Sequence, residues 1–205
     1  MKRAKFTLGP VLGYHGCDRQ VAEGILAGQS QLKHSENDYD WLGPGIYFWI
    51  DSPERGFIWA QEQCRRPASR IKEPAVLGAF IHPGLCLNLT DFGVSDELLI
   101  AYQTLVESCQ SVGIAPPRNS VMRDGILMRR HLDCAVIKTV HQLRHDAGLE
   151  AYDSVYGVFE EGEPLFPGSG FRAKTHIQMA VINPECVLGY FRVPPFNAPA
   201  AYVAS

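Results

Sequence analysis

The sequence predicts a single α+β domain, and three observations support this. Strand-like segments gather toward both ends of the 205-residue chain and helix-like segments interrupt its middle, without the regular strand–helix alternation of a doubly wound sheet. Glycine and proline are frequent, at 19 and 14 residues, which suits short strands joined by turns. Because no low-complexity linker divides the chain, we expect one folded domain over residues 1–193 and a loose tail over residues 194–205.

The first elements are a strand and a short capped helix. Val11–Tyr14 is apolar and predicts a strand that ends in a tight turn at His15-Gly16. Asp18 is a suitable cap for a helix that Gly28 ends. The polar residues 29–40 predict a loop.

A second strand and helix follow at once. Ile46–Trp49 is a short aromatic strand preceded by glycines. Ser52, with its capping hydroxyl, and Pro53 at the first helical position predict a helix that runs to about Cys64.

Strands and helices are mixed in the remainder of the chain. The expected strands cover residues 75–81, 85–89, 154–159, 175–182 and 187–193. The expected helices cover residues 96–109 and 132–145, the second ended near Gly148, and the expected loops cover residues 113–119 and 160–174.

The net charge and the cysteine content bear on nucleic-acid binding and on metal sites. The net charge of −3 provides no global basic field for nucleic acid, and the simplest interpretation of local basic clusters is a solvated surface. Two such clusters occur, Arg65, Arg66, Arg70 and Lys72, and Arg129, Arg130 and His131. None of the six cysteines forms a CxxC pair, so we expect no metal site.

The chain carries no recognisable targeting or membrane segment. Residues 1–10 lack the apolar stretch of a signal peptide, and no apolar run approaches the ~18 residues of a membrane span. We therefore expect a cytoplasmic protein with reduced thiols and no membrane partner. The sequence also lacks GxGxxG and GxxxxGK[ST], so neither a Rossmann nor a P-loop nucleotide site is supported.

The first motif that suggests chemistry is Tyr14-His15-Gly16-Cys17. A histidine at a strand end can offer a ring nitrogen to a ligand hydroxyl, and the glycine beside it lets a ligand approach the backbone. Taken alone, the motif is more simply a histidine whose hydrogen bonds are satisfied at a turn.

The second motif is the glycine-flanked strand Gly43–Trp49, followed by a helix with Trp59 and Ala60. An aromatic ring on a rigid strand can stack on a flat heteroaromatic ligand. By strand alternation Tyr47 and Trp49 face away from the core residue Phe48.

Together, "YHG" and "GPGIYFW" with the following helix resemble the nicotinamide-binding signature of the poly(ADP-ribose) polymerase-like, or diphtheria-toxin-like, ADP-ribosyltransferases. The resemblance implies a split β-sheet core with flanking helices, and NAD as the substrate. It also implies that His15 binds the adenine-side ribose, that Gly16 holds the nicotinamide carboxamide through its backbone, and that Tyr47 stacks on the nicotinamide ring. Tyr14 is counted with them as a binding residue. The resemblance leaves residues 89–150 without a motif.

The catalytic element departs from the family pattern. The family places a catalytic residue, often glutamate, on a later strand, but the strand over residues 175–182 has none. His176 and Gln178 project from one face of that strand, and with Tyr47 they are the catalytic candidates. Gln178 would contact the reacting ribose, and His176 would serve as a base or contact the acceptor. Loss of the glutamate is typical of transfer of a single unit or of an inactive protein.

The segment before this strand is where the family keeps its acceptor loop. Phe171, Arg172 and Lys174 are the candidate acceptor-binding residues, and they would contact a base, a phosphate or a protein side chain.

The sequence thus predicts a mono-ADP-ribosyltransferase that releases nicotinamide and marks a macromolecule, with nucleic acid slightly favoured over protein. Stand-alone domains of this type resemble toxins of toxin–antitoxin and phage-defence systems, and the resemblance implies an antitoxin protein as a partner. The alternatives are an inactive NAD- or ADP-ribose-binding module, an RNA 2′-phosphotransferase, and an enzyme that only hydrolyses NAD.

Overall fold

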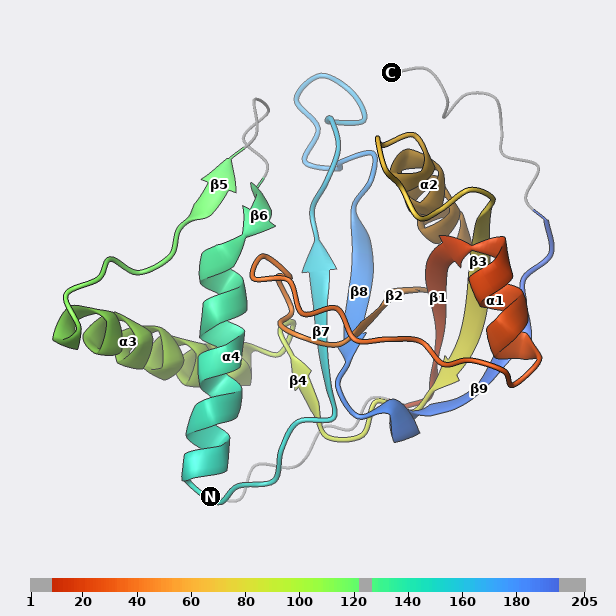
Figure 1. The fold of residues 1–205 in the computed structure, drawn as a ribbon. Coiled ribbons are helices and arrows are strands. Elements are labelled where there is room, and N and C mark those ends of the chain that lie inside the picture. Colours follow the sequence, from red (N-terminus) through yellow and green to blue (C-terminus); the bar gives the residue numbers. More distant parts are fainter. Residues whose placement is uncertain (1–8, 122–126, 196–205) are drawn as a thin grey trace.

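The structure, a computed structural model, describes residues 9–121 and 127–195 (Figure 1). Seven strands form one mixed sheet in the order β4-β7-β8-β2-β1-β3-β9. They are β1 (Val11–Asp18), β2 (Ile46–Ile50), β3 (Pro74–Ile81), β4 (Cys86–Asn88), β7 (Ser154–Phe159), β8 (His176–Val181) and β9 (Val187–Arg192). A separate hairpin joins β5 (Asn119–Val121) to β6 (Leu127–Arg130). The predicted α+β class is confirmed.

Helices lie on both sides of this sheet. The described part of the chain contains α1 (Arg19–Leu26), α2 (Pro53–Cys64), α3 (Ser95–Ser111) and α4 (His131–Asp146). Helices α1 and α2 pack on strands β1 and β3 at one end of the sheet. Helices α3 and α4 pack on each other at the other end of the molecule (Figure 1). None of these described helices is long and apolar enough to cross a membrane.

The two halves of the sheet are joined narrowly at its centre. Strand β1 pairs with β3 along its whole length from Val11 to Asp18, and β2 pairs with β8 along all of Ile46–Ile50. Between β1 and β2, however, only Gly13–Ile50 and Tyr14–Trp49 are paired. Beyond Tyr14 the two strands separate, and this separation positions the candidate site.

Different apolar clusters hold the two faces of the sheet. Phe48 is fully buried and packs with residues of β3 and β8, as expected for the core side of its strand. On the other side, Leu42 and Trp41 join a cluster that includes residues of α3, α4 and β7. The cluster around Phe48 includes residues of both halves, so side-chain packing joins the halves although few backbone bonds do.

Several predictions of where helices begin and end are confirmed. The Asp18 carboxylate caps α1 by accepting a hydrogen bond from the Gln20 amide at 2.9 Å. Gly28, just beyond that helix, has a φ of +71°, a conformation that favours glycine. The helix from Pro53 to Cys64 has the predicted bounds.

Other local predictions were wrong. Strand β1 does not end in a turn at His15-Gly16 but continues to Asp18, because β3 provides a partner for every residue. Ser52 precedes α2 but makes no side-chain cap. The β5–β6 hairpin was not predicted, since its strands are too short to show a periodic pattern.

The expected loop over residues 160–174 is confirmed as the connection between β7 and β8, and a few cross-chain backbone contacts extend the hairpin into it. Lys174 and Ala173 donate backbone hydrogen bonds to Glu161 and Glu163, and Pro164 bridges Arg172. The predicted loose tail from residue 194 lies, from residue 196 onward, outside the described residues, as do residues 1–8.

Candidate functional site

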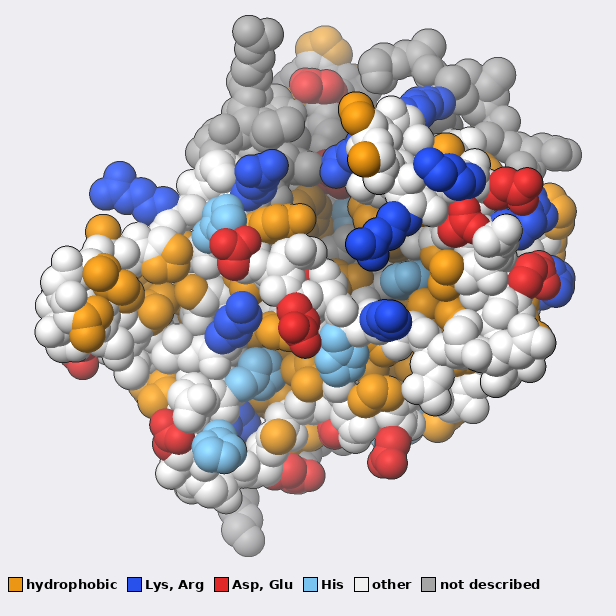
Figure 2. Space-filling view, in the orientation of Figure 1, with side chains coloured by type: hydrophobic (Ala, Val, Ile, Leu, Met, Phe, Trp, Pro, Cys, Tyr) orange, Lys and Arg blue, Asp and Glu red, His pale blue; other side chains and the backbone are white. Residues whose placement is uncertain are grey.

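A cleft of about 530 Å³ opens where β1 and β2 separate. Its walls come from β1, β2, α2, the loop before β2, and the β7–β8 hairpin. Figure 2 shows it as a hollow near the centre of the molecule with basic and acidic side chains around its rim. Of the residues predicted from the sequence, the structure brings His15, Gly16, Tyr47, His176 and Gln178 to this cleft.

The backbone of Gly16 faces the separation between the strands. The Leu12 carbonyl accepts a hydrogen bond from the Asp51 amide, so by antiparallel alternation the main-chain groups of residues 12, 14 and 16 all point toward β2. In a continued ladder Gly16 would pair with Tyr47. The Tyr47 carbonyl is bound instead by the His15 ring, 2.8 Å from Nδ1. The amide and carbonyl of Gly16 are therefore directed into the cleft.

His15 has a defined tautomer in this arrangement. Its Nδ1 can bond the Tyr47 carbonyl only as an N–H donor, so in the neutral ring Nε2 is an acceptor. Burial lowers the pKa of His15, while the bond to the carbonyl partly opposes this change. A neutral imidazole with an accepting Nε2 suits a ligand hydroxyl.

Gly16 also has a packing role that the sequence did not reveal. A Cβ atom built on Gly16 would lie 2.3 Å from the carbonyl oxygen of Gly56, which is backbone and cannot easily move. Helix α2 therefore crosses β1 at a contact between two glycines. This close crossing brings Arg55, the residue before Gly56 in α2, against the cleft.

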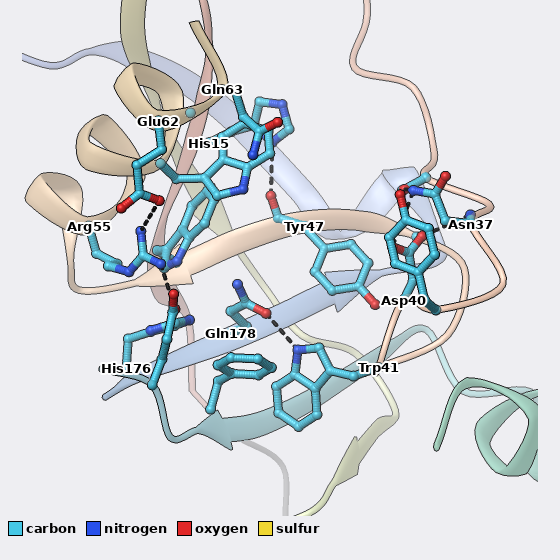
Figure 3. A pocket seen from close by; sticks show the side chains of 18 of the residues that line it. His15, Asn37, Asp40, Trp41, Tyr47, Arg55, Glu62, Gln63, His176 and Gln178 are labelled. Atoms are coloured by element: carbon cyan, nitrogen blue, oxygen red, sulfur yellow. Dashed lines mark hydrogen bonds and ion pairs between the residues drawn. The ribbon is translucent and has the colours of Figure 1, made fainter. Parts of the chain in front are cut away.

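Tyr47 offers its ring and not its hydroxyl. The hydroxyl donates to the Gly43 carbonyl at 2.9 Å and accepts from the Leu42 amide at 3.0 Å. Burial raises the pKa of Tyr47 well above its ordinary value. The ring is thus fixed by the loop before β2 and forms part of the cleft wall, but the hydroxyl is a poor proton donor for a ligand (Figure 3).

The orientation of the Gln178 amide is fixed by Trp41. The indole Nε1, which can only donate, lies 2.6 Å from Gln178 Oε1. Trp41 reaches this position by lying over Gly157, where a Cβ would be 2.7 Å from the indole ring. The amide nitrogen consequently points toward the middle of the pocket, as Figure 3 shows. Gln178 thus presents the N–H donors of its amide to a ligand.

His176 is more deeply buried than the sequence suggested. It is 7% exposed, its ring stacks on Phe159, and its Nδ1 lies 2.6 Å from the Lys174 carbonyl. Burial, assisted by nearby Arg55, lowers the pKa of His176 to about 4, although the bond to Lys174 and the charge of Glu161 act in the opposite direction. His176 is therefore neutral at pH 7 and a weak base, and its accepting atom is Nε2.

Sequence reasoning missed the charged residues of the cleft. Arg55 is 8% exposed, and its guanidinium bonds the Glu161 carboxylate at 2.6 Å and lies 3.9 Å from that of Glu62. Because Lys174 donates its amide to the Glu161 carbonyl, Glu161 lies opposite Lys174 on the hairpin and shares the cleft face with His176. A carboxylate thus reaches the cleft from the extension of β7, although β8 has none. Because Phe159 and Glu161 are two residues apart, strand alternation in the sequence could have predicted that both face the cleft.

Other predicted residues do not line the cleft. The Tyr14 ring packs edge-on against Phe191, with ring centres 6.1 Å apart. Phe171 is 70% exposed near the end of the hairpin, and Arg172 donates to the Gly162 carbonyl. Lys174 forms an ion pair at 2.9 Å with Glu62, which lines the cleft, but is not itself among the lining residues.

One of the two basic clusters reaches the rim of the cleft. The guanidinium of Arg129 lies 5.9 Å from the ring centre of Tyr39, and that of Arg130 lies 5.0 Å from the centre of the Trp41 ring. Tyr39 and Trp41 both line the cleft. From the other cluster, Arg66 contributes to the opposite wall. Two guanidinium groups thus lie beside aromatic rings that line the cleft.

Metal ligands do not gather in the described residues, where no group of three or more His, Cys, Asp or Glu side chains has the spacing of a metal site. The six cysteines are all free thiols.

Compared with known proteins, the chain matches no protein-family model, no curated protein and no solved structure.

Proposed function

We propose that this protein is a mono-ADP-ribosyltransferase that binds NAD in the cleft, releases nicotinamide and transfers ADP-ribose to a macromolecule. The observation that carries the proposal is the separation of β1 from β2 beyond Tyr14. It directs the Gly16 backbone, the Tyr47 ring and the Gln178 amide toward one cleft, with His15 at the point of separation. Of these, His15, Gly16 and Tyr47 also carry the resemblance in sequence, whereas Gln178 stands where the family pattern is not met.

Each wall of the cleft would serve one part of the dinucleotide. The Gly16 amide and carbonyl match the acceptor and donor of a carboxamide, and the fixed Tyr47 ring would stack on the nicotinamide. His15 Nε2 would accept a hydrogen bond from a ribose hydroxyl. Holding the nicotinamide at its carboxamide and its ring would orient its glycosidic bond for cleavage.

Gln178 would act by position and polarity. Because its oxygen is bound to Trp41, the amide nitrogen would donate to a ribose oxygen near the breaking bond. An amide donor cannot remove a proton, so a proton acceptor must come from elsewhere in the cleft. Glu161 and His176 are the nearest candidates on the hairpin.

A nucleic-acid acceptor is supported by the rim of the cleft. Arginine guanidinium groups beside aromatic rings hold single strands by stacking and backbone contacts. Arg129 beside Tyr39 and Arg130 beside Trp41 provide this combination next to the cleft. A role as a toxin with an antitoxin partner rests on the sequence resemblance, and a cytoplasmic location rests on the apolar patterning of the sequence; both belong to the proposal.

The second candidate is a module that binds NAD without turning it over. It is favoured by one observation, which is that β8 presents the Gln178 amide where a carboxylate would be expected. An RNA 2′-phosphotransferase would need a basic pocket for a terminal phosphate, whereas the Arg55 cation is already paired with Glu161.

The test combines binding and turnover. Calorimetry with NAD should detect binding, and incubation with NAD labelled in its adenylate part should release nicotinamide and label material in a cell lysate. Separate nuclease and protease digestion then identifies the acceptor. Binding without nicotinamide release would support the inactive module, and the absence of NAD binding would reject both candidates.

A further inference from the structure

At the hairpin end of the cleft, three buried side chains from different elements have polar atoms without hydrogen-bond partners. Trp49 of β2, Arg55 of α2 and His176 of β8 are 4%, 8% and 7% exposed. The unpartnered atoms are Trp49 Nε1, Arg55 Nε and Nη1, and His176 Nε2. Buried polar atoms in native proteins nearly always have partners, so several unpartnered ones on side chains that line one cleft indicate that a ligand supplies what is missing.

The three side chains are close neighbours. The Arg55 guanidinium lies 5.9 Å from the centre of the Trp49 ring, and the Trp49 and His176 ring centres are 6.3 Å apart. All three line the cleft, and Figure 3 shows Arg55 and His176 on one side of it. These distances place the side chains close enough for one small ligand group to contact more than one of them.

The chemistry of these atoms restricts the ligand group. Trp49 Nε1 and the two Arg55 nitrogens can only donate, whereas His176 Nε2 can only accept, because its Nδ1 proton is held by the Lys174 carbonyl. The missing group must therefore accept hydrogen bonds and donate one. A hydroxyl does both, with two lone pairs and one proton.

Charged ligand groups fit this arrangement poorly. A guanidinium or ammonium ion would face the positive charge of Arg55 and offer nothing to the indole N–H. A carboxylate would direct its lone pairs at His176 Nε2, which also has a lone pair, and would compete with Glu161 for Arg55. The arrangement therefore selects a neutral oxygen group over a charged nitrogen or oxygen group.

We infer that Trp49, Arg55 and His176 form the subsite for the attacking group of the proposed transferase, and that this group is an alcoholic hydroxyl. The inference rests on the proposed function. For the nucleic-acid acceptor proposed above, the modified group is then a ribose hydroxyl, which makes RNA the favoured macromolecule.

The transfer step balances with this assignment. The hydroxyl oxygen forms a bond to the anomeric carbon of the nicotinamide-side ribose as the carbon–nitrogen bond breaks. The electron pair of that bond goes to the ring nitrogen, and nicotinamide leaves as a neutral molecule. The hydroxyl proton passes to His176 Nε2 and then to solvent, and the negative charge of Glu161 stabilises the transient imidazolium.

The test uses small acceptors with the whole protein and NAD. Methanol provides a minimal hydroxyl and agmatine a minimal guanidinium, and the products are separated by chromatography and identified by mass. We expect methyl-ADP-ribose to form in methanol, in competition with ADP-ribose from water, and no agmatine conjugate. An agmatine conjugate without methyl-ADP-ribose would overturn the inference and leave the proposed function intact. Absence of NAD binding would overturn both.

A matched pair of variants tests the residues. Trp49→Phe keeps an aromatic ring but removes the buried N–H, and it should lower the rate of methyl-ADP-ribose formation about tenfold at saturating NAD, the effect of one hydrogen bond to the attacking group. NAD affinity should change little. His141→Asn removes another buried unpartnered nitrogen, His141 Nε2, at a residue outside the cleft lining, and it should retain the wild-type rate. Equal rates in the two variants with unchanged NAD affinity would overturn the assignment of Trp49.

Discussion

The Nδ1 atom of His15 lies 2.8 Å from the backbone carbonyl oxygen of Tyr47, across the point where β1 and β2 separate. A side chain thus takes the bond that the Gly16 amide would make in a continued ladder. One hydrogen bond therefore caps the end of the ladder and fixes the tautomer of a histidine in the cleft. It also links the two motifs of the resemblance directly in space.

This relationship separates two roles of His15. An asparagine can place its amide nitrogen where Nδ1 stands, but it has no counterpart of Nε2. We expect His15→Asn to keep most of the stability yet to weaken NAD binding by about 1–3 kcal/mol, because a ligand hydroxyl loses its acceptor. His15→Ala should lose both binding and stability. Calorimetry and thermal unfolding measure the two effects, and wild-type affinity in a folded His15→Asn protein would contradict the role of Nε2.

The Tyr47 ring and hydroxyl should likewise be separable. Tyr47→Phe removes the bonds to Leu42 and Gly43 and should destabilise the fold by about 1–3 kcal/mol, since the Leu42 amide is left unpaired, while keeping the stacking surface. Tyr47→Ala should in addition weaken NAD binding by about 1–3 kcal/mol, by analogy with base stacking. If the phenylalanine and alanine variants bound NAD equally well, stacking on this ring would be excluded.

Trp41 and Gln178 should be coupled. We expect Gln178→Ala to slow nicotinamide release by roughly 5- to 150-fold, the equivalent of about 1–3 kcal/mol in the barrier, and to destabilise the fold because the Trp41 N–H loses its acceptor. Adding Trp41→Phe to this variant should restore part of the stability but none of the activity. Turnover and unfolding measurements on the single and double variants check this, and recovery of activity in the double variant would contradict it.

Stability should fall on acidification. The pKa of His176 falls from 6.5 to about 4 on folding, so between these values the unfolded chain binds more protons. The contribution of His176 is complete above pH 6.5 and is lost as the pH falls toward 4, by about 3 kcal/mol in total. His15 and His141, whose pKa values burial also lowers, act in the same direction.

Denaturant unfolding between pH 4 and 7 measures this dependence. In His176→Asn, which cannot titrate, stability should fall less steeply with decreasing pH. The matched control is His145→Asn, since the His145 side chain is 84% exposed. An identical pH dependence in wild type and His176→Asn would show that His176 is not the buried titrating group.

The acceptor prediction concerns charge at the hairpin. Reversing Arg172 and Lys174 to glutamate should suppress labelling of nucleic acid while leaving NAD affinity unchanged, because neither residue lines the cleft. Wild-type labelling should also weaken steeply as salt rises, as phosphate contacts require. Reversal of Arg70 and Arg192, outside the cleft lining, is the matched control. Label that resists nuclease but is removed by protease would instead identify a protein acceptor.

Much of the local structure could be predicted because local residues determine it. Asp18 caps the first helix, Gly28 ends it, and Phe48 alternates with Tyr47 across β2. These features depend on side-chain spacing and backbone conformation within a few residues. The placement of the β1 end was missed, because whether a strand continues depends on a partner strand sixty residues away.

The sequence by itself determined the α+β class, the glycine-flanked aromatic strand and the residue types available for chemistry. Only the tertiary structure decided which of them meet. Trp41 and Gln178 are 137 positions apart, and Arg55 and Glu161 are 106 apart, yet each pair is joined by a bond of 2.6 Å. No local pattern encodes such contacts, because they depend on strand order, on the register of β7 with β8 and on the close crossing of α2 over β1 at Gly16. The packing of distant segments therefore set the charge and hydrogen-bonding character of the cleft.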